Sequence, residues 1–195
     1  LTAARSEALI LASNPSTLEA VERLSASFAA LGDEALAQTT LQDAYITRNP
    51  NPASSRDQMD RADGPYSYHF NHEIYHPFFR NTRTQAGYYD LFLFDRQGNM
   101  IYSVAKETDF ATNFTTGPHA QSNLGTAVQA ALDGAPGEVY LADYAPYEPS
   151  MGAPASFLTT RIHAVDGTYL GVLGIQLPID RLAQALADPV GLGPS

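Results

Sequence analysis

The sequence predicts an α+β domain in which long N-terminal helices precede a five-stranded antiparallel sheet, with flanking helices packed on one face of that sheet. Two observations lead to this prediction. Up to Ala86, apolar side chains recur at steps of three and four, which is the period of an amphipathic helix. From Tyr88 onward, short runs of β-branched and aromatic residues alternate with turn signals, and only one helical stretch interrupts them.

The helices are marked by their caps and apolar stripes. Ser13-Asn14-Pro15 is a helix start signal, because a polar cap is followed by proline at the first helical position. Gly32 ends this helix and Asp33 can cap the next one. An aromatic-rich helix is expected from Ser67 to Ala86, kinked or interrupted at Pro77. The two apolar stripes consist of Leu18, Val21, Leu24, Phe28 and Leu31, and of Leu36, Leu41, Ala44 and Tyr45.

Five strands are expected in the second half of the chain. Arg96-Gln97-Gly98-Asn99 and Val165-Asp166-Gly167 are hairpin signatures that join two pairs of them. Ser122 can cap a crossover helix, and 180–187 forms a short exit helix. Adjacent hairpins with one crossover helix are the layout of a PAS-like module. The expected strands are Tyr88–Asp95, Met100–Ala105, Glu138–Tyr144, Pro154–Ala164 and Thr168–Leu177.

The chain divides into an N-terminal helical segment (1–65), a PAS-like module (66–188) and a tail (189–195) that leads towards a further module or the membrane. Residues before Ser13 are compatible with a long helix that enters from upstream. The first residue is Leu1 and no basic-then-apolar leader precedes it, so we expect an excised segment whose flanks hold the localisation signals.

Composition excludes several classes of protein. The chain has 195 residues, with 11 Lys and Arg against 21 Asp and Glu, which gives a net charge of −10. Because cations are scarce, we expect neither nucleic-acid binding nor a polybasic membrane surface. The absence of cysteine excludes disulfides, thiol catalysis and cysteine-ligated zinc. Apolar runs such as Tyr169–Leu177 are far shorter than the ~20 residues that a membrane-spanning helix needs.

His72-Glu73-Ile74-Tyr75-His76 is a formal H-E-x-x-H motif. In zinc metalloproteases the two histidines bind the metal from one helix face and the glutamate activates a water. Here Pro77 biases His76 away from helical backbone angles, which weakens that arrangement. His69 extends the series, and we expect all three histidines on the polar side of the helix, as surface or interface residues without a metal.

Aromatic residues on the predicted strands suggest a small binding pocket, because a tyrosine combines an apolar ring with a hydroxyl that can hold a polar ligand. Phe92 and Tyr102 of the first hairpin are candidates, although the same residues are also typical of a plain core. Lys106 and Asp109 follow the second strand and would stand at the pocket rim, where Lys106 would pair with a carboxylate. A solvated turn is the alternative interpretation of these two residues.

The segment from Ala145 to Pro154 is long for a hairpin and rich in turn formers, which is typical of functional lids. In a PAS-like layout it would close over the pocket. Tyr144 and Tyr147 would then contact the ligand.

The next two strands add further candidates. Ser156 and Thr160 share one face of their strand, and we expect this face to point into the pocket. The reason is that Arg161 and His163 lie on the alternate face, which water would tolerate better. Gln176 of the last strand would supply an amide to the same cavity.

Five segments follow one another in an order that is typical of a known sensor family. They are Gly87–Asp95, Gly98–Val104, Lys106–Asn113, Gly152-Ala153-Pro154 and Gly171–Asp180. In order and spacing, from about Tyr66 to Leu186, they resemble Cache (PDC) sensor domains, and the helical part resembles the family's long N-terminal helix.

The resemblance implies the periplasmic, extracytoplasmic part of an inner-membrane receptor, most like those of methyl-accepting chemotaxis receptors. It implies a small polar ligand such as a carboxylate, amine or amino acid, a conformational signal, and a homodimer formed through the N-terminal helix. It implies no catalytic residue, cofactor or metal. Where amino-acid-sensing members carry an acidic residue on the final strand this chain has Gln176, so the resemblance does not extend to specificity for α-amino acids.

Two alternatives stay open. A ligand-free PAS-like module would serve as a structural or protein-contact unit, with Tyr147 and its loop docking a partner. A zinc hydrolase would use the H-E-x-x-H motif.

Overall fold

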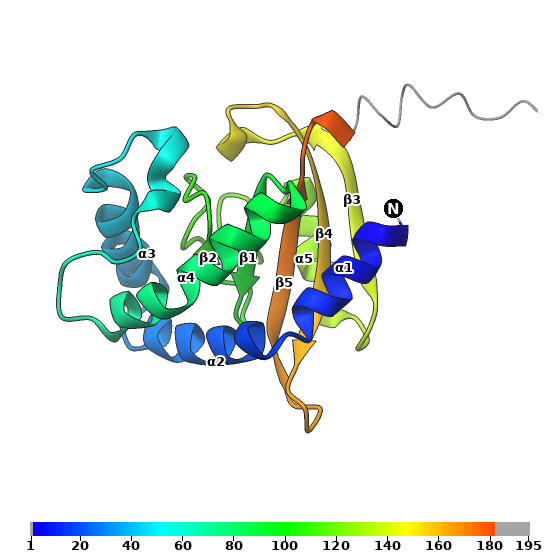
Figure 1. Ribbon diagram of the computed structural model, residues 1–195, viewed down its shortest axis with the longest axis horizontal. Coiled ribbons are helices and arrows are strands. Elements are labelled where there is room, and N and C mark those ends of the chain that lie inside the picture. Colours follow the sequence, from blue (N-terminus) through cyan, green and yellow to red (C-terminus); the bar gives the residue numbers. More distant parts are fainter. Residues whose placement is uncertain (1, 182–195) are drawn as a thin grey trace, which may run out of the picture.

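The computed structural model describes residues 2–181 (Figure 1). Helices come first, and one helix interrupts the strands that follow, as the sequence predicts. The helices are α1 (Thr2–Ala12), α2 (Pro15–Ala29), α3 (Glu34–Gln42), α4 (Ser67–Ala86) and α5 (Asn123–Asp133). The strands are β1 (Asp90–Phe94), β2 (Met100–Ser103), β3 (Val139–Pro146), β4 (Pro154–His163) and β5 (Tyr169–Leu177). Short turns of π- or 3₁₀-helix lie at Asp43–Thr47, Ala53–Gln58 and Glu148–Ser150.

The strands form one sheet in the order β2-β1-β5-β4-β3, and every neighbouring pair is antiparallel. The α+β class with a five-stranded antiparallel sheet is therefore confirmed. Each strand lies within two residues of the range expected from the sequence. The first and last strands of the chain order, β1 and β5, are paired at the centre of the sheet, which brings Asp90 opposite Gln176.

Helices cover both faces of the sheet, so the prediction that they pack on one face is wrong (Figure 1). Every residue of β1 is buried. Leu91 and Leu93 point into a core formed with α1, α2 and α4, whereas Phe92 and Phe94 point into a second core with α5. A strand with apolar residues at consecutive positions needs cover on both sides, and that is the physical reason for the two layers.

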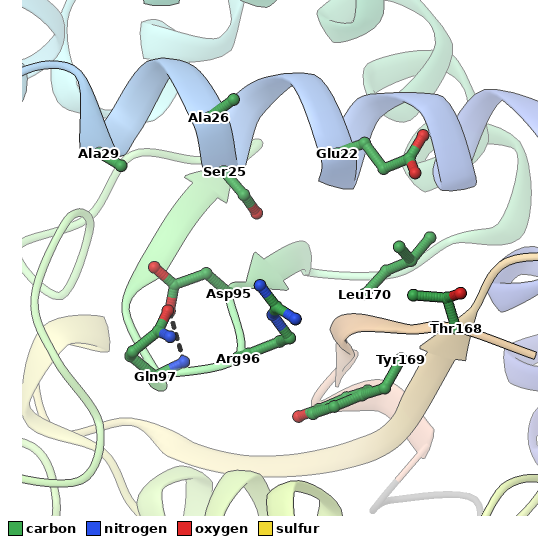
Figure 2. A pocket seen from close by; sticks show the side chains of 10 residues that line it. All are labelled: Glu22, Ser25, Ala26, Ala29, Asp95, Arg96, Gln97, Thr168, Tyr169 and Leu170. Atoms are coloured by element: carbon green, nitrogen blue, oxygen red, sulfur yellow. Dashed lines mark hydrogen bonds between the residues drawn. The ribbon is translucent and has the colours of Figure 1, made fainter.

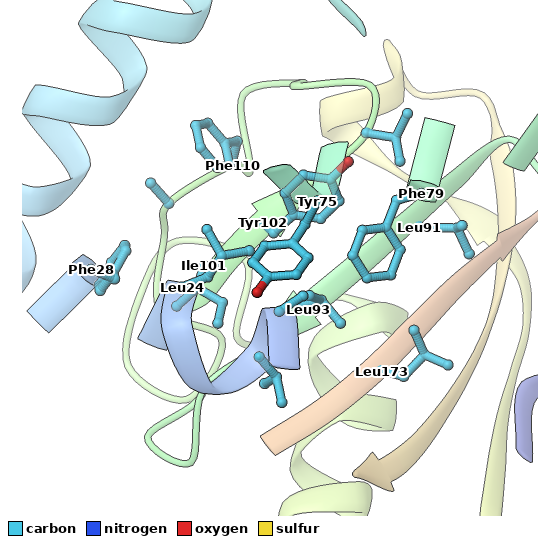
Figure 3. Close-up of a cluster of buried hydrophobic side chains, with 14 of the residues drawn as sticks. Leu24, Phe28, Tyr75, Phe79, Leu91, Leu93, Ile101, Tyr102, Phe110 and Leu173 are labelled. Atoms are coloured by element: carbon cyan, nitrogen blue, oxygen red, sulfur yellow. The ribbon is translucent and has the colours of Figure 1, made fainter. Parts of the chain in front are cut away.

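The core beneath α2 and α4 is large and mostly aromatic or aliphatic (Figure 3). Leu24 of α2 and Phe79 of α4 meet Leu93 and Leu173 from the two central strands. These side chains are at most 1% exposed. The first core therefore joins the N-terminal helices to the sheet.

The predicted caps are present. Asn14 accepts a hydrogen bond from the amide of Ser16 (2.9 Å), Asp33 from that of Leu36 (2.8 Å) and Ser122 from that of Gly125 (3.0 Å). Gly87 ends α4 at φ +71°, a backbone conformation that glycine adopts without a steric cost.

Two details of the helical region differ from the expectation. Leu36 is 54% exposed and does not belong to an apolar stripe. The predicted helix start at Ser13-Asn14-Pro15 is confirmed, and it divides the long N-terminal helix that the resemblance implies into α1 and α2, which pack on the sheet at an angle to each other (Figure 1). The expected exit helix begins at Asp180 and Arg181, and its remainder lies outside the described residues, as does the tail at 189–195.

Within residues 2–181, no helix is both long enough and apolar enough to cross a membrane.

A pair of leucine substitutions tests the first core. Leu93→Ala should lower the free energy of unfolding by about 2–5 kcal/mol, because Leu93 is fully buried and its loss leaves a cavity. Leu36→Ala is the matched control and should change it by less than about 0.5 kcal/mol, since this side chain is mostly exposed. Urea unfolding of the two variants measures the difference, and similar losses would contradict the packing described here.

Candidate functional site

Three aromatic side chains, those of Phe92, Tyr147 and Phe157, cluster on the face of the sheet towards α5, and we call them the aromatic floor. Phe92 of β1 and Phe157 of β4 lie with ring centroids 6.2 Å apart, and Tyr147 meets Phe157 edge-on at 5.0 Å. All three side chains are at most 1% exposed. Tyr147 comes from the loop between β3 and β4, so this loop contributes directly to the floor.

On the same face, Asp90 and Gln176 form a polar row at the end where β1 begins and β5 ends. Asp90, Gln176 and Phe157 are direct neighbours on three adjacent strands, so their side chains share one face. Asp90 is held by the protein itself: its carboxylate accepts bonds from the amides of Leu91 (2.7 Å) and Val104 (3.0 Å). Gln176 is less completely bonded, because only its Nε2 atom donates, to Ser150 Oγ at 3.2 Å.

The loop after β2 brings two acidic residues against this row. Asp109 accepts a hydrogen bond from the Tyr147 hydroxyl at 2.6 Å. Glu107 accepts bonds from Tyr89 (2.6 Å) and Ser150 (2.8 Å). The predicted lid at 145–154 is thus tied to both carboxyl groups through two of its own buried side chains, Tyr147 and Ser150.

Two buried oxygen atoms of this site lack a hydrogen-bond partner anywhere in the described chain: Asp109 Oδ1 and Gln176 Oε1. Buried polar atoms in proteins are almost always paired, so each exception calls for an explanation. Both atoms belong to residues that the sequence proposed as ligand contacts. An ionised carboxylate and an amide oxygen are both acceptors, and they would suit a ligand that donates hydrogen bonds.

Burial dominates the electrostatics of the site. It raises the pKa of Asp109 to about 8, against a partial stabilisation of the charged form by the Tyr147 hydroxyl. Burial likewise raises the pKa of Asp90 to about 6 and that of Glu107 above its usual range. The site therefore gathers three carboxyl groups and contains no arginine or lysine among the residues described above.

Four of the predicted site residues come together here: Phe92, Asp109, Tyr147 and Gln176. Tyr144 lies apart from them, because its hydroxyl donates to the carbonyl of Pro178 at 2.9 Å.

The prediction that Ser156 and Thr160 face the pocket is wrong. They alternate with Phe157 along β4 and point towards α1, where their hydroxyls donate to the carbonyls of Ala142 and Glu138. The reason that favoured them fails as well. Arg161 is partly buried against α5, and its Nε donates to the carbonyl of Ala131 at 3.0 Å in the last turn of that helix.

Lys106 and Tyr102 lie on the other face of the sheet, so they do not line this site. Lys106 is 1% exposed, and its Nζ lies 4.5 Å from the ring centroid of Tyr102 and 5.1 Å from that of Phe110. Burial lowers its pKa to about 7, against the opposing effect of Asp90. Neither a pocket rim nor a solvated turn describes this residue.

The three histidines of α4 are buried, which corrects the expectation of surface residues. His72 and His76 stack with ring centroids 4.5 Å apart. His76 Nε2 lies 2.7 Å from the carbonyl of Asp57, so it must donate, and Nδ1 then accepts from the Tyr102 hydroxyl at 2.6 Å. Burial lowers the pKa of His76 to about 2, which keeps the ring neutral.

These contacts leave the H-E-x-x-H motif without the geometry of a zinc site. Pro77 does not unwind α4, but His76 uses both ring nitrogens within the protein, and Glu73 points outward to Arg61 (3.4 Å). Across residues 2–181, no group of three or more potential ligands is arranged to hold a metal ion.

Asp90, Ser150 and Phe157 belong to this arrangement but are not among the ligand contacts that the sequence predicts. Because side chains alternate along a strand, Phe157 shares a face with Arg161, and an arginine on a face favours exposure of that face to water. Asp90 opens a buried strand, where an acidic residue needs several hydrogen-bond donors, and that unusual position was the available signal. Nothing local in the sequence marks Ser150.

Comparisons with known proteins give similarities to solved structures. No family model and no curated protein matches the sequence. The sensor domain of the V. cholerae histidine kinase DctB is 15% identical, with a TM-score of 0.43, over 87% of this chain and 57% of that one. The E. coli DcuS sensor domain is 18% identical, with a TM-score of 0.42, over 83% of this chain and 98% of that one.

The ligand-binding domain of the Pseudomonas fluorescens chemoreceptor CtaA, solved with L-serine, is 16% identical with a TM-score of 0.43 over 80% of this chain. This chain spans less than two thirds of the CtaA and DctB domains, at 59% and 57% of their lengths. All three are described as sensor or ligand-binding domains, of DctB, DcuS and the chemoreceptor CtaA. Because the TM-scores lie below 0.5, the fold rests on the strand order of this chain and not on the matches.

The raised pKa of Asp109 has a consequence for stability. Between the ordinary value of 3.8 and the folded value of about 8, the folded protein holds a proton that the unfolded chain has lost. The free energy of unfolding therefore falls as pH rises through this window, by less than about 1.4 kcal/mol per pH unit for this group.

Asp109→Asn removes the titrating group while keeping an oxygen that can accept from Tyr147. Between about pH 5 and about pH 9, a range that contains the raised pKa of Asp109, the free energy of unfolding should fall less for the variant than for the unaltered protein. Urea unfolding at several pH values checks this, and parallel profiles for the two proteins would show that Asp109 does not titrate in this range.

Proposed function

We propose that this chain is the ligand-sensing domain of a transmembrane signalling receptor and that it binds a small amine between the sheet and the loop at 145–154. The single observation that supports this function is the pair of unpartnered buried oxygens, Asp109 Oδ1 and Gln176 Oε1, above an aromatic floor. A small-molecule site of this kind combines apolar walls with a few converging polar groups.

The charge of the site selects an amine over a carboxylate. In their ionised forms Asp109, Glu107 and Asp90 would repel an anion and attract a cation, and Lys106 lies on the far face of the sheet. An ammonium group has three donors, and two of them would be met by Asp109 Oδ1 and Gln176 Oε1. The carboxylate and α-amino-acid ligands that the sequence left open fit less well, because none of the site residues described above is a lysine or arginine that could pair with their carboxylate.

A signal would leave the site through β5. Gln176 is the second-to-last residue of this strand, and its carbonyl accepts from the amide of Tyr89 at 3.0 Å. Tyr144 holds the carbonyl of Pro178 just beyond the strand end. Ligand contact at Gln176 would therefore shift the start of the C-terminal segment, and a coupling of about 1–3 kcal/mol is enough for a response.

The sequence resemblance adds the setting: an extracytoplasmic, membrane-anchored receptor of the chemotaxis type, paired through its N-terminal helices. The outer side of α1 carries Leu9 and Ile10, which are 38% and 69% exposed and would suit such a contact. The alternative of a protein-contact module that docks through Tyr147 is disfavoured, because this side chain is 1% exposed and bonded to Asp109.

Calorimetric titration with primary amines, amino acids and organic acids tests the proposal. At about pH 8, where Asp109 begins to ionise, we expect at least one amine to bind and Asp109→Asn to weaken its binding by at least tenfold, as loss of a charge-assisted hydrogen bond does. The acids should not bind at this site.

Asp143→Asn is the matched control, since Asp143 lies exposed on β3 and away from the site. It should leave amine binding unchanged. Failure of every class of ligand, or equal losses in the two variants, would contradict the proposed function.

A further inference from the structure

A pocket lies at the other end of the two central strands. It has a volume of about 500 Å³ and opens between α2, the β1–β2 turn and the start of β5 (Figure 2). This volume is within the range of small-molecule sites. Its lining residues include Ser25 and Ala29 of α2, Asp95 and Arg96 of the turn, and Tyr169 and Leu170 of β5.

Two hydroxyl groups of this pocket are buried without a partner in the described chain: Ser25 Oγ and Tyr169 OH. Figure 2 shows the Ser25 hydroxyl pointing from α2 towards Arg96, with Tyr169 on the opposite wall. Ser27, two residues further along α2, behaves differently. Its hydroxyl donates to the carbonyl of Arg23 at 2.8 Å, so α2 can satisfy a serine internally and does not do so at Ser25.

Arg96 supplies the positive charge. It forms no ion pair with any described residue. The neighbouring Asp95 does not compete for it, because the Asp95 carboxylate already accepts from the amides of Gln97 (3.0 Å) and Asn99 (2.9 Å) and from the Asn99 side chain (2.9 Å). A guanidinium and two free hydroxyls are all hydrogen-bond donors, and their shared complement is a carboxylate.

We infer that the pocket between Ser25, Arg96 and Tyr169 binds a small aliphatic monocarboxylate, independently of the amine site. The carboxylate would pair with Arg96 and accept from the two hydroxyls, while Ala26, Ala29 and Leu170 would contact a short alkyl chain. A single negative charge fits better than the two of a phosphate, because one arginine faces the pocket and Glu22 stands at its edge.

The two sites sit at opposite ends of the same strands. Asp90 and Asp95 bracket β1, and Gln176 and Tyr169 lie near the two ends of β5, which separates the sites by roughly 20 Å. The second site faces different side chains and a ligand of opposite charge. It therefore remains testable whether or not an amine binds at Asp109.

The test follows backbone amide signals of the whole chain by ¹H–¹⁵N NMR while sodium butyrate is added at constant ionic strength. We expect saturable shifts at Ser25, Arg96 and Tyr169, and weaker binding of acetate by several-fold, because each buried methylene adds favourable transfer energy. Arg96→Gln should weaken butyrate binding at least tenfold, and Tyr169→Phe, which removes only the hydroxyl, several-fold.

Arg5→Gln is the matched control, since Arg5 is an exposed arginine of α1. It should bind butyrate normally, and so should Asp109→Asn. The inference is overturned if the shifts do not saturate, if Arg5→Gln weakens binding as much as Arg96→Gln, if inorganic phosphate binds more tightly than butyrate, or if the shifts gather around Asp109 instead.

Discussion

The burial of the Asp109 carboxyl group is the constraint on which the proposed site depends. Water would normally solvate this group, and the fold replaces water with one hydrogen bond from Tyr147 and leaves the second oxygen unpartnered. Such an arrangement lowers stability at neutral pH unless something else compensates. Tyr147 cannot hold Asp109 without closing the loop at 145–154, so the lid, the acid and the aromatic floor form one unit.

The two layers of helices explain why this unit is possible. The core beneath α2 and α4 supplies most of the apolar burial and fixes β1 and β5 at the centre of the sheet. The face towards α5 can then carry polar groups such as Asp90 and Gln176 at one end without loss of the fold. The buried histidines belong to the stabilising layer, where His76 links α4 to β2 through Tyr102 and to the 53–58 turn through Asp57.

Local sequence signals predict the helices and strands, but they do not predict which face of a strand meets which layer of the fold. Caps at Asn14, Asp33 and Ser122, and glycine-containing turns, act over a few residues and can be recognised directly. The choice between the two faces of β4 depends on which layer each face meets, and here both layers are apolar: Thr159 and Thr160 are both fully buried. Burial therefore does not distinguish the two faces, and only a sheet covered by helices on one side would favour the face that carries Ser156 and Thr160.

The burial of the three histidines of α4 differs from the prediction for another reason. His69, His72 and His76 recur at helical spacing with Tyr68, Tyr75 and Phe79, and this pattern indicates burial, whereas histidine as a residue type favours a polar face. Lys106 is harder still. Its burial depends on a backbone with φ +58° after β2 and on an aromatic enclosure from three separate elements, none of which a local sequence pattern records.

The most direct measurement of the central claim is the pKa of Asp109 by ¹³C NMR of its carboxyl group, with and without a saturating amine. A free value near 8 that falls by more than about one unit when the amine binds is the expected result, because a neighbouring cation favours the charged carboxylate. An ordinary acidic pKa in the free protein, or a raised value that the bound amine leaves unchanged, would contradict it.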